Sequence, residues 1–187
     1  AISSNAHALA RYSALVQENG MVPIVEPEVL MDGDHSADVC LSKTSDVIQK
    51  CFEELILHKV DLSGIILKPN MILAGNKSKE KISSDEVSEK TLKCLKNSVP
   101  SEVPGIAFLS GGQSEIEATE NLNSINKKNN TNFIITYSYG RALQQGALKL
   151  WSKNTNDIEG TQKIFNHRAK MCSLAAQGIW SSKLENK

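Results

Sequence analysis

The stretch Gly64-Ile65-Ile66-Leu67-Lys68-Pro69 places a lysine directly after a short apolar run. Three other runs have the same character and lie at Val22–Val25, Gly105–Leu109 and Phe133–Tyr137. Each run is continuously apolar or β-branched rather than alternating, which is typical of strands covered on both faces. The four runs therefore predict parallel strands.

The longer segments between these runs have apolar residues at helical spacing. One segment carries Val47, Ile48, Cys51, Phe52, Leu55 and Ile56, and another carries Ile116, Thr119, Leu122 and Ile125. Two helix starts are also predicted by capping boxes, in which Ser83 precedes Glu86 by three residues and Ser114 precedes Glu117 likewise. These segments are predicted to be crossover helices.

Helices are predicted at both ends of the chain as well. A leading helix over residues 4–19 ends at Gly20, a residue suited to the left-handed position after a helix. Residues 142–151 and 158–176 read as two closing helices, and a short polar tail follows from about residue 181. We therefore expect residues 1–187 to form a single domain with a leading helix and four β-α units.

Parallel β-α units form either an open doubly wound sheet or an eight-stranded barrel. A full barrel typically takes about 250 residues, whereas this chain has 187 residues and four predicted strands. If the fold is a barrel, the chain supplies half of it. Its two edge strands would then be unpaired unless other protein covers them.

Composition excludes several classes of protein. Lys plus Arg total 21 and Asp plus Glu total 21, so no net charge draws in nucleic acid or an anionic membrane. The longest apolar stretches fall far below the roughly 18 residues that span a bilayer. The four cysteines form no C-x-x-C pair, and the four histidines lack paired spacing. We expect reduced core cysteines, a cytoplasmic protein and no metal site.

Polar side chains follow the predicted strands where each strand ends. Glu26, Lys68 and Ser110 are spaced 42 residues apart, and Ser138 and Arg141 follow the fourth run. Successive β-α units deliver such residues to one edge, where barrels and open α/β sheets keep their chemistry. We expect these side chains to meet there.

Lys68 is the first candidate for chemistry. An apolar wall around a lysine favours its uncharged amine, which can attack a carbonyl and form an iminium that accepts electrons. The alternative is a lysine that extends from a strand end into solvent. Glu26 could exchange protons with the carbinolamine or could serve only as a salt-bridge partner, and Glu28 is expected in a supporting position behind it.

The third and fourth strand ends predict a phosphate site. Ser110-Gly111-Gly112 stands before a predicted helix, which lets backbone amides approach an anion. Ser138-Tyr139-Gly140-Arg141 has the same character and adds a guanidinium. Barrels often bind phosphate after their last two strands.

Taken together, four ordered motifs closely resemble the class I fructose-1,6-bisphosphate aldolases. The motifs are Val22–Glu28, Leu67–Met71, Phe108–Ser114 and Ser138–Leu143. The resemblance implies a glycolytic lyase with a TIM barrel, of which this chain supplies about the last four β-α units. It also implies a cytoplasmic homotetramer that needs no cofactor or metal.

The resemblance assigns roles to particular residues. Lys68 matches the lysine that forms a Schiff base with dihydroxyacetone phosphate, and Glu26 matches the acid–base glutamate. The positions that hold a substrate phosphate match Ser110, Gly111, Ser138, Gly140 and Arg141.

This sequence departs from the family pattern at two places. Family members have a first barrel half that contributes an aspartate and further lysines, and no position here corresponds to them. The family tail also runs on to a terminal tyrosine, whereas this chain stops at Glu185-Asn186-Lys187. We therefore expect this chain alone to be inactive. A noncatalytic phosphate-binding or scaffold module, and a lysine-dependent aldolase for another sugar phosphate, stay open as alternatives.

Overall fold

The computed structural model describes residues 1–186, which alternate strands and helices after an opening helix. The strands are β1 (Ile24–Val25), β2 (Ile66–Leu67), β3 (Gly105–Phe108) and β4 (Ile134–Tyr137). The helices are α1 (Ile2–Glu18), α2 (Ala37–Leu57), α3 (Ser84–Ser98), α4 (Glu115–Lys128), α5 (Arg141–Lys153) and α6 (Ile158–Ala176). Short 3-10 turns lie at Leu62–Gly64 and Ser182–Leu184.

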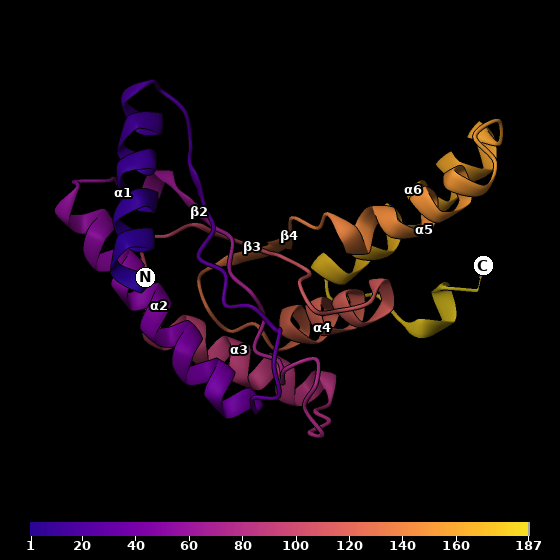
Figure 1. Ribbon diagram of the computed structural model, residues 1–187, viewed down its shortest axis with the longest axis horizontal. Coiled ribbons are helices and arrows are strands. Elements are labelled where there is room, and N and C mark those ends of the chain that lie inside the picture. The colour runs from indigo at the N-terminus through magenta and orange to yellow at the C-terminus, as the bar shows by residue number, and fades with distance from the viewer. Residues whose placement is uncertain (187) are drawn as a thin grey trace.

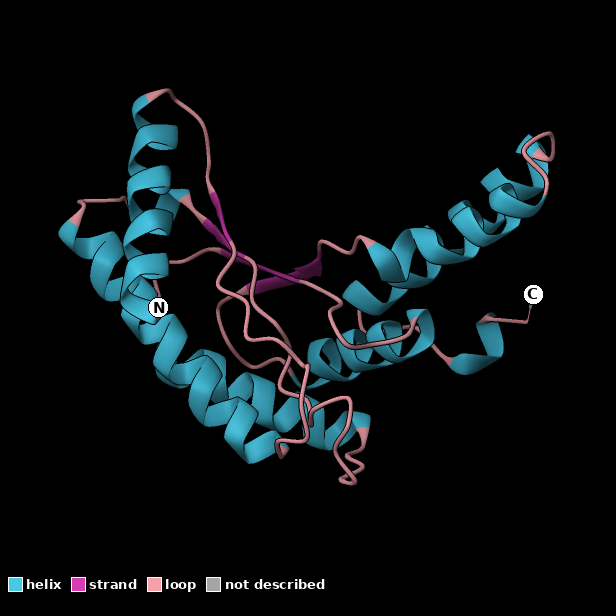
Figure 2. Cartoon of the chain, in the orientation of Figure 1, coloured by secondary structure: helices cyan, strands magenta, loops and turns pink. Residues whose placement is uncertain are grey.

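The strands form one sheet in the order β1-β2-β3-β4, and every neighbouring pair is parallel. The helices lie in an arc around three sides of this sheet, from α1 through α2, α3 and α4 to α5 and α6 (Figures 1 and 2). Each strand run predicted from the sequence contains one strand, although the first two strands are only two residues long. The prediction of parallel strands with crossover helices is confirmed.

One face of the sheet belongs to the core. The register aligns Val25, Leu67, Ile106 and Ile135 across all four strands, and each of these side chains is at most 4% exposed. Together with apolar side chains of the helices they form one continuous hydrophobic cluster. This row holds the strand ends at a common level.

The other face of the sheet differs from the prediction. Strands covered on both faces were expected, but Ile24 is 44% exposed and Ile134 is 74% exposed. These residues begin the neighbouring row, whose side chains point away from the helices because successive residues of a strand alternate. Within the described part of the chain the sheet does not close, so the two ends of this row, Ile24 and Ile134, are exposed.

Helix ends follow the predicted signals closely. Both capping boxes are present, with Ser83 and Ser114 as the capping residues of α3 and α4. The leading helix occupies residues 2–18 rather than 4–19, and Gly20 adopts the left-handed φ of 70° just beyond it. Helix α5 extends slightly beyond the predicted range, whereas α6 has the predicted bounds.

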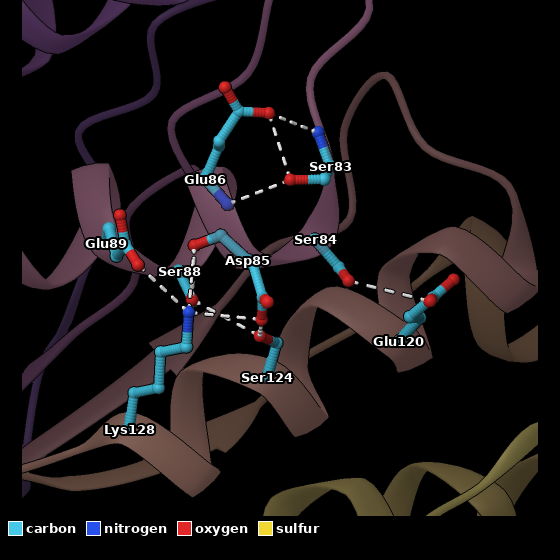
Figure 3. A network of polar contacts seen from close by, with 9 residues as sticks. All are labelled: Ser83, Ser84, Asp85, Glu86, Ser88, Glu89, Glu120, Ser124 and Lys128. Carbon is cyan, nitrogen blue, oxygen red and sulfur yellow. Dashed lines mark hydrogen bonds and ion pairs between the residues drawn. The ribbon is translucent and has the colours of Figure 1, made fainter.

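A polar network joins α3 to α4 (Figure 3). Lys128 Nζ lies 3.1 Å from Asp85 Oδ1 and 3.1 Å from Glu89 Oε1, and the Ser124 hydroxyl donates to Asp85 Oδ1 at 3.1 Å. These carboxylates are exposed, so each ion pair contributes little by itself. The network fixes the lateral position of two adjacent crossover helices.

The predicted polar tail from about residue 181 is docked against α6 through Glu185. Arg168 donates to both carboxylate oxygens of Glu185, at 3.0 and 2.8 Å, and the Trp180 indole donates to Glu185 Oε1 at 2.9 Å. A buried guanidinium needs a counter-charge, and Glu185 supplies it. Lys187, the last residue of the predicted tail, lies outside the described residues.

Candidate functional site

The strand register places Lys68 beside Glu26. Val25 and Leu67 are partners in the pairing of β1 with β2, so the next residues along each strand leave the sheet side by side. Lys68 Nζ lies 3.0 Å from Glu26 Oε1. The lysine side chain is 18% exposed and the glutamate side chain is 43% exposed, so this ion pair is half-shielded from water.

All the predicted site residues line one hollow of about 220 Å³ at the carboxyl ends of the strands. Its lining consists of Glu26, Glu28, Lys68, Leu109, Ser110, Gly111, Ser138, Gly140 and Arg141. The sequence did not single out Leu109, which ends the third apolar run. From their spacing in the sequence, these side chains were expected to lie at one edge of the sheet, and they line this hollow together.

A larger hollow of about 560 Å³ lies under the segment of residues 73–84 and reaches α4. The carboxylate of Glu117, one of its lining groups, accepts a hydrogen bond from the backbone N–H of Ser114. The chemistry-bearing lysine lies in the smaller hollow, so we place the candidate site there.

The two turns predicted to bind phosphate differ in structure. The N-terminus of α4 is occupied by its own capping box, because Ser114 accepts from the Glu117 N–H and Glu117 accepts from the Ser114 N–H. Helix α5 begins after Gly140, and no side chain among residues 1–186 caps it by a hydrogen bond. The positive end of α5 therefore faces the hollow with free backbone donors, beside Arg141.

Buried anchors hold the loops of the site. The Tyr139 hydroxyl donates to the Ala118 carbonyl at 2.9 Å, and burial raises the pKa of this phenol well above its usual value. Tyr139 thus stays neutral and fixes the loop that carries Ser138 and Gly140 against α4. The apolar character of the fourth run did not reveal this role.

Asn70 is a second anchor that the sequence analysis did not identify. Its Oδ1 accepts from the Val29 N–H at 3.0 Å, and its Nδ2 donates to Thr44 Oγ1 at 3.0 Å. One buried amide therefore ties the loop after Lys68 to the segment after Glu28 and to α2. Its place directly after Lys68-Pro69 is the only sequence signal that could have pointed to it.

No helix within residues 1–186 has the length and apolar character required to cross a membrane. In the same part of the chain, one cluster of His and Glu side chains has the composition of a metal site, formed by His7, Glu54 and His58. These residues lie on α1 and at the end of α2, outside the set that lines the hollow.

A family model described as "Glycolytic: Fructose-bisphosphate aldolase class-I" matches residues 1–187. A probable fructose-bisphosphate aldolase class 1 of Xanthomonas campestris pv. campestris is 48% identical over 180 residues, which cover 96% of this chain and 54% of that protein. The cytosolic fructose-bisphosphate aldolase 4 of Arabidopsis thaliana is 47% identical over 179 residues, which cover 95% and 46%.

A solved structure of fructose-bisphosphate aldolase from Plasmodium falciparum, in complex with TRAP and a small-molecule inhibitor, is also similar. It superposes with a TM-score of 0.93 at 42% identity and covers 97% of this chain and 52% of that one. This match confirms the predicted fold class, about the last four β-α units of a TIM barrel. The chain spans about half the length of the curated relatives it matches.

Proposed function

Since the chain belongs to the class I fructose-bisphosphate aldolase family, we propose that the protein containing it reversibly cleaves fructose 1,6-bisphosphate, with Lys68 as the nucleophile. The products are dihydroxyacetone phosphate and glyceraldehyde 3-phosphate. The observation that carries the proposal is the 3.0 Å contact between Lys68 Nζ and Glu26 Oε1 at the mouth of the hollow.

In this proposal Glu26 moves the protons that imine formation requires. Glu26 accepts the proton that Lys68 gives up, the free amine attacks the sugar ketone, and a proton then moves from nitrogen to the new alkoxide oxygen to give the carbinolamine. The carbinolamine then loses its hydroxyl as water when a carboxylic acid returns a proton to that oxygen. A carboxyl group 3.0 Å from Nζ is within reach of both transfers.

The iminium on Lys68 then serves as the electron acceptor for carbon–carbon cleavage. The electrons of the bond adjacent to the former carbonyl carbon move into the iminium and give an enamine, while the hydroxyl proton on the departing side goes to a base. This lysine chemistry supplies its own electron sink, so it requires no cofactor and no metal.

The phosphate of the bound ketose is assigned to the α5 side of the hollow. Arg141 can form two parallel hydrogen bonds with a phosphate, and the uncapped first turn of α5 after Gly140 adds backbone donors. Ser110, Gly111 and Ser138 line the same hollow from the neighbouring strand ends. Lys68, which directly follows β2 and lines the same hollow, then reaches the ketone carbon next to the phosphate-bearing carbon.

We propose that residues 1–187 alone do not turn over substrate. Within the described residues, β1 and β4 are the edges of an open sheet, and the face that carries Ile24 and Ile134 is exposed. A hollow with one open side loses positioning and exclusion of water, both of which class I chemistry needs. The family further supports a cytoplasmic homotetramer, which cell fractionation and light scattering would test.

The proposal is tested by trapping the imine. The protein that contains this chain is incubated with dihydroxyacetone phosphate and borohydride, and the modified peptide is identified by mass spectrometry. We expect a single adduct on Lys68, its loss in Lys68→Met and its retention in Lys43→Met, a control on the exposed face of α2. Binding of the phosphate without any adduct would instead support a noncatalytic phosphate-binding module.

A further inference from the structure

Two helices bring three metal-ligating side chains together away from the hollow. His7 lies on α1, Glu54 lies in the last turn of α2, and His58 directly follows that helix. His7 Nδ1 is 3.2 Å from Glu54 Oε2, and one ligand atom from each of the three residues lies within 4.8 Å of the other two. The rings of His7 and His58 meet edge to face at 4.8 Å.

The hydrogen bonds of this cluster pair His7 Nδ1 with Glu54 Oε2 and engage Nδ1 of His58. His58 Nδ1 lies 2.9 Å from the backbone carbonyl of Glu54. In the neutral ring that nitrogen is the donor, so Nε2 carries the free lone pair, the arrangement common in metal-ligating histidines. Lys50 Nζ is 3.7 Å from Glu54 Oε1, which leaves Oε2 facing His7.

We propose that His7, Glu54 and His58 bind one divalent ion of the zinc class and thereby clip α1 to the end of α2. Two imidazoles and one carboxylate suit Zn²⁺, Co²⁺, Ni²⁺ or Cu²⁺ rather than the oxygen-bound Ca²⁺ or Mg²⁺. The His7 side chain is 52% exposed, so water can complete the coordination.

The geometry requires only a small adjustment. Tetrahedral zinc with bonds of about 2.0–2.1 Å holds its ligand atoms about 3.3 Å apart. The His7–Glu54 separation of 3.2 Å already meets this. The remaining separations, both to His58 and at most 4.8 Å, close when the half-exposed His7 ring and the Glu54 carboxylate shift together toward His58. No metal site was predicted from the sequence, because the four histidines lack paired spacing and His7 and Glu54 come from segments 47 residues apart.

The test is a titration of the metal-free protein with Co²⁺, followed by its visible absorption, and then displacement by Zn²⁺. We expect one equivalent to bind. His7→Ala and His58→Ala should each weaken binding at least about tenfold, since even the loss of a group that only orients a ligand costs about 10–100-fold. His167→Ala removes a histidine that contacts a different carboxylate, Glu185, and should leave binding unchanged.

Thermal unfolding supplies an independent readout. Zn²⁺ should raise the unfolding midpoint of the unaltered protein, because a ligand that binds only the folded state stabilises it, and this rise should vanish in His7→Ala. His7 lies on an exposed helix face, so this variant is expected to fold. Absence of one-to-one binding, equal affinity in the histidine variants, or a thiolate-to-cobalt charge-transfer band would each overturn the proposal.

Discussion

Gly111 leaves the space into which the carboxylate of Glu28 extends. A Cβ atom at Gly111 would lie 2.8 Å from Glu28 Oε1 and 3.1 Å from Leu109 Cδ1. Both groups line the candidate site, so the absence of a side chain at Gly111 shapes the hollow itself. The neighbouring Gly112 has a different reason to be glycine: its φ is 77°, and a Cβ there would meet Met31 Cβ at 2.7 Å.

These adjacent glycines should respond differently to the same substitution. Gly111→Ala displaces the flexible end of Glu28, so we expect kcat/KM of the protein containing this chain to fall about 10–100-fold. Its free energy of unfolding should change by less than about 1 kcal/mol. Gly112→Ala should instead lower the free energy of unfolding by about 2–4 kcal/mol through left-handed strain and overpacking. Denaturant unfolding and steady-state kinetics on both variants separate the two effects, and equal losses of stability would contradict this assignment.

Glu26→Gln tests the proton-transfer role directly. The amide keeps the size of the side chain but cannot accept the proton of Lys68, so imine formation should slow by about 10²–10⁴-fold. Single-turnover trapping with borohydride measures this rate. Glu28→Gln is the matched control, because Glu28 lines the same hollow but lies beside Gly111. A larger defect in the Glu28 variant would reverse the assignment of the two glutamates.

The strand ends were predictable because they depend on local pattern. Apolar runs of four to five residues, each followed by a polar residue, place Glu26, Lys68 and Ser110 at one edge whatever the details of packing. The capping boxes at Ser83 and Ser114 are equally local. Such signals need only the neighbouring residues, and the structure contains all of them.

Features that depend on contacts between distant segments could not be predicted. The exposure of Ile134 depends on whether another segment packs on the sheet, and the apolar character of the residue does not reveal this. Arg168 and Glu185 read as ordinary surface charges until folding brings them together. The anchoring amide of Asn70 likewise acts on segments 26 and 41 residues away.

The docked tail predicts a loss of stability at acid pH. Burial alone would raise the pKa of Glu185, but the hydrogen bonds from Arg168 and Trp180 outweigh burial and hold this pKa below its usual 4.5. A carboxyl group whose pKa is lowered by folding stabilises the fold above the unfolded-state pKa. That contribution is lost as pH falls through the folded-state pKa.

Glu185→Gln should therefore lower the free energy of unfolding at pH 7 by about 3–5 kcal/mol, because it leaves the buried Arg168 guanidinium without its counter-charge. The variant should also lose less stability than the parent when the pH is lowered from about 5 to 3. Urea unfolding at several pH values measures both effects. Glu102→Gln, an exposed control, should reproduce the parent curve.

The cysteines are expected to be unreactive while the protein is folded. All four are free and buried, and desolvation raises the pKa of Cys51 to about 12. A thiol whose pKa is raised by folding stays protonated at pH values well above its unfolded-state pKa of about 8.5. The contribution of the buried neutral thiol to stability is therefore fully present below a pH of about 8.5 and is lost as the pH rises toward 12.

Iodoacetamide at pH 8 should therefore modify the folded protein only as fast as the protein opens, and it should modify all four cysteines in guanidinium. Ser173→Cys, which places a thiol on the exposed face of α6 next to Cys172, should add one rapid modification by mass spectrometry. Rapid labelling of the unaltered protein would show that its core opens easily at these helices, contrary to this expectation.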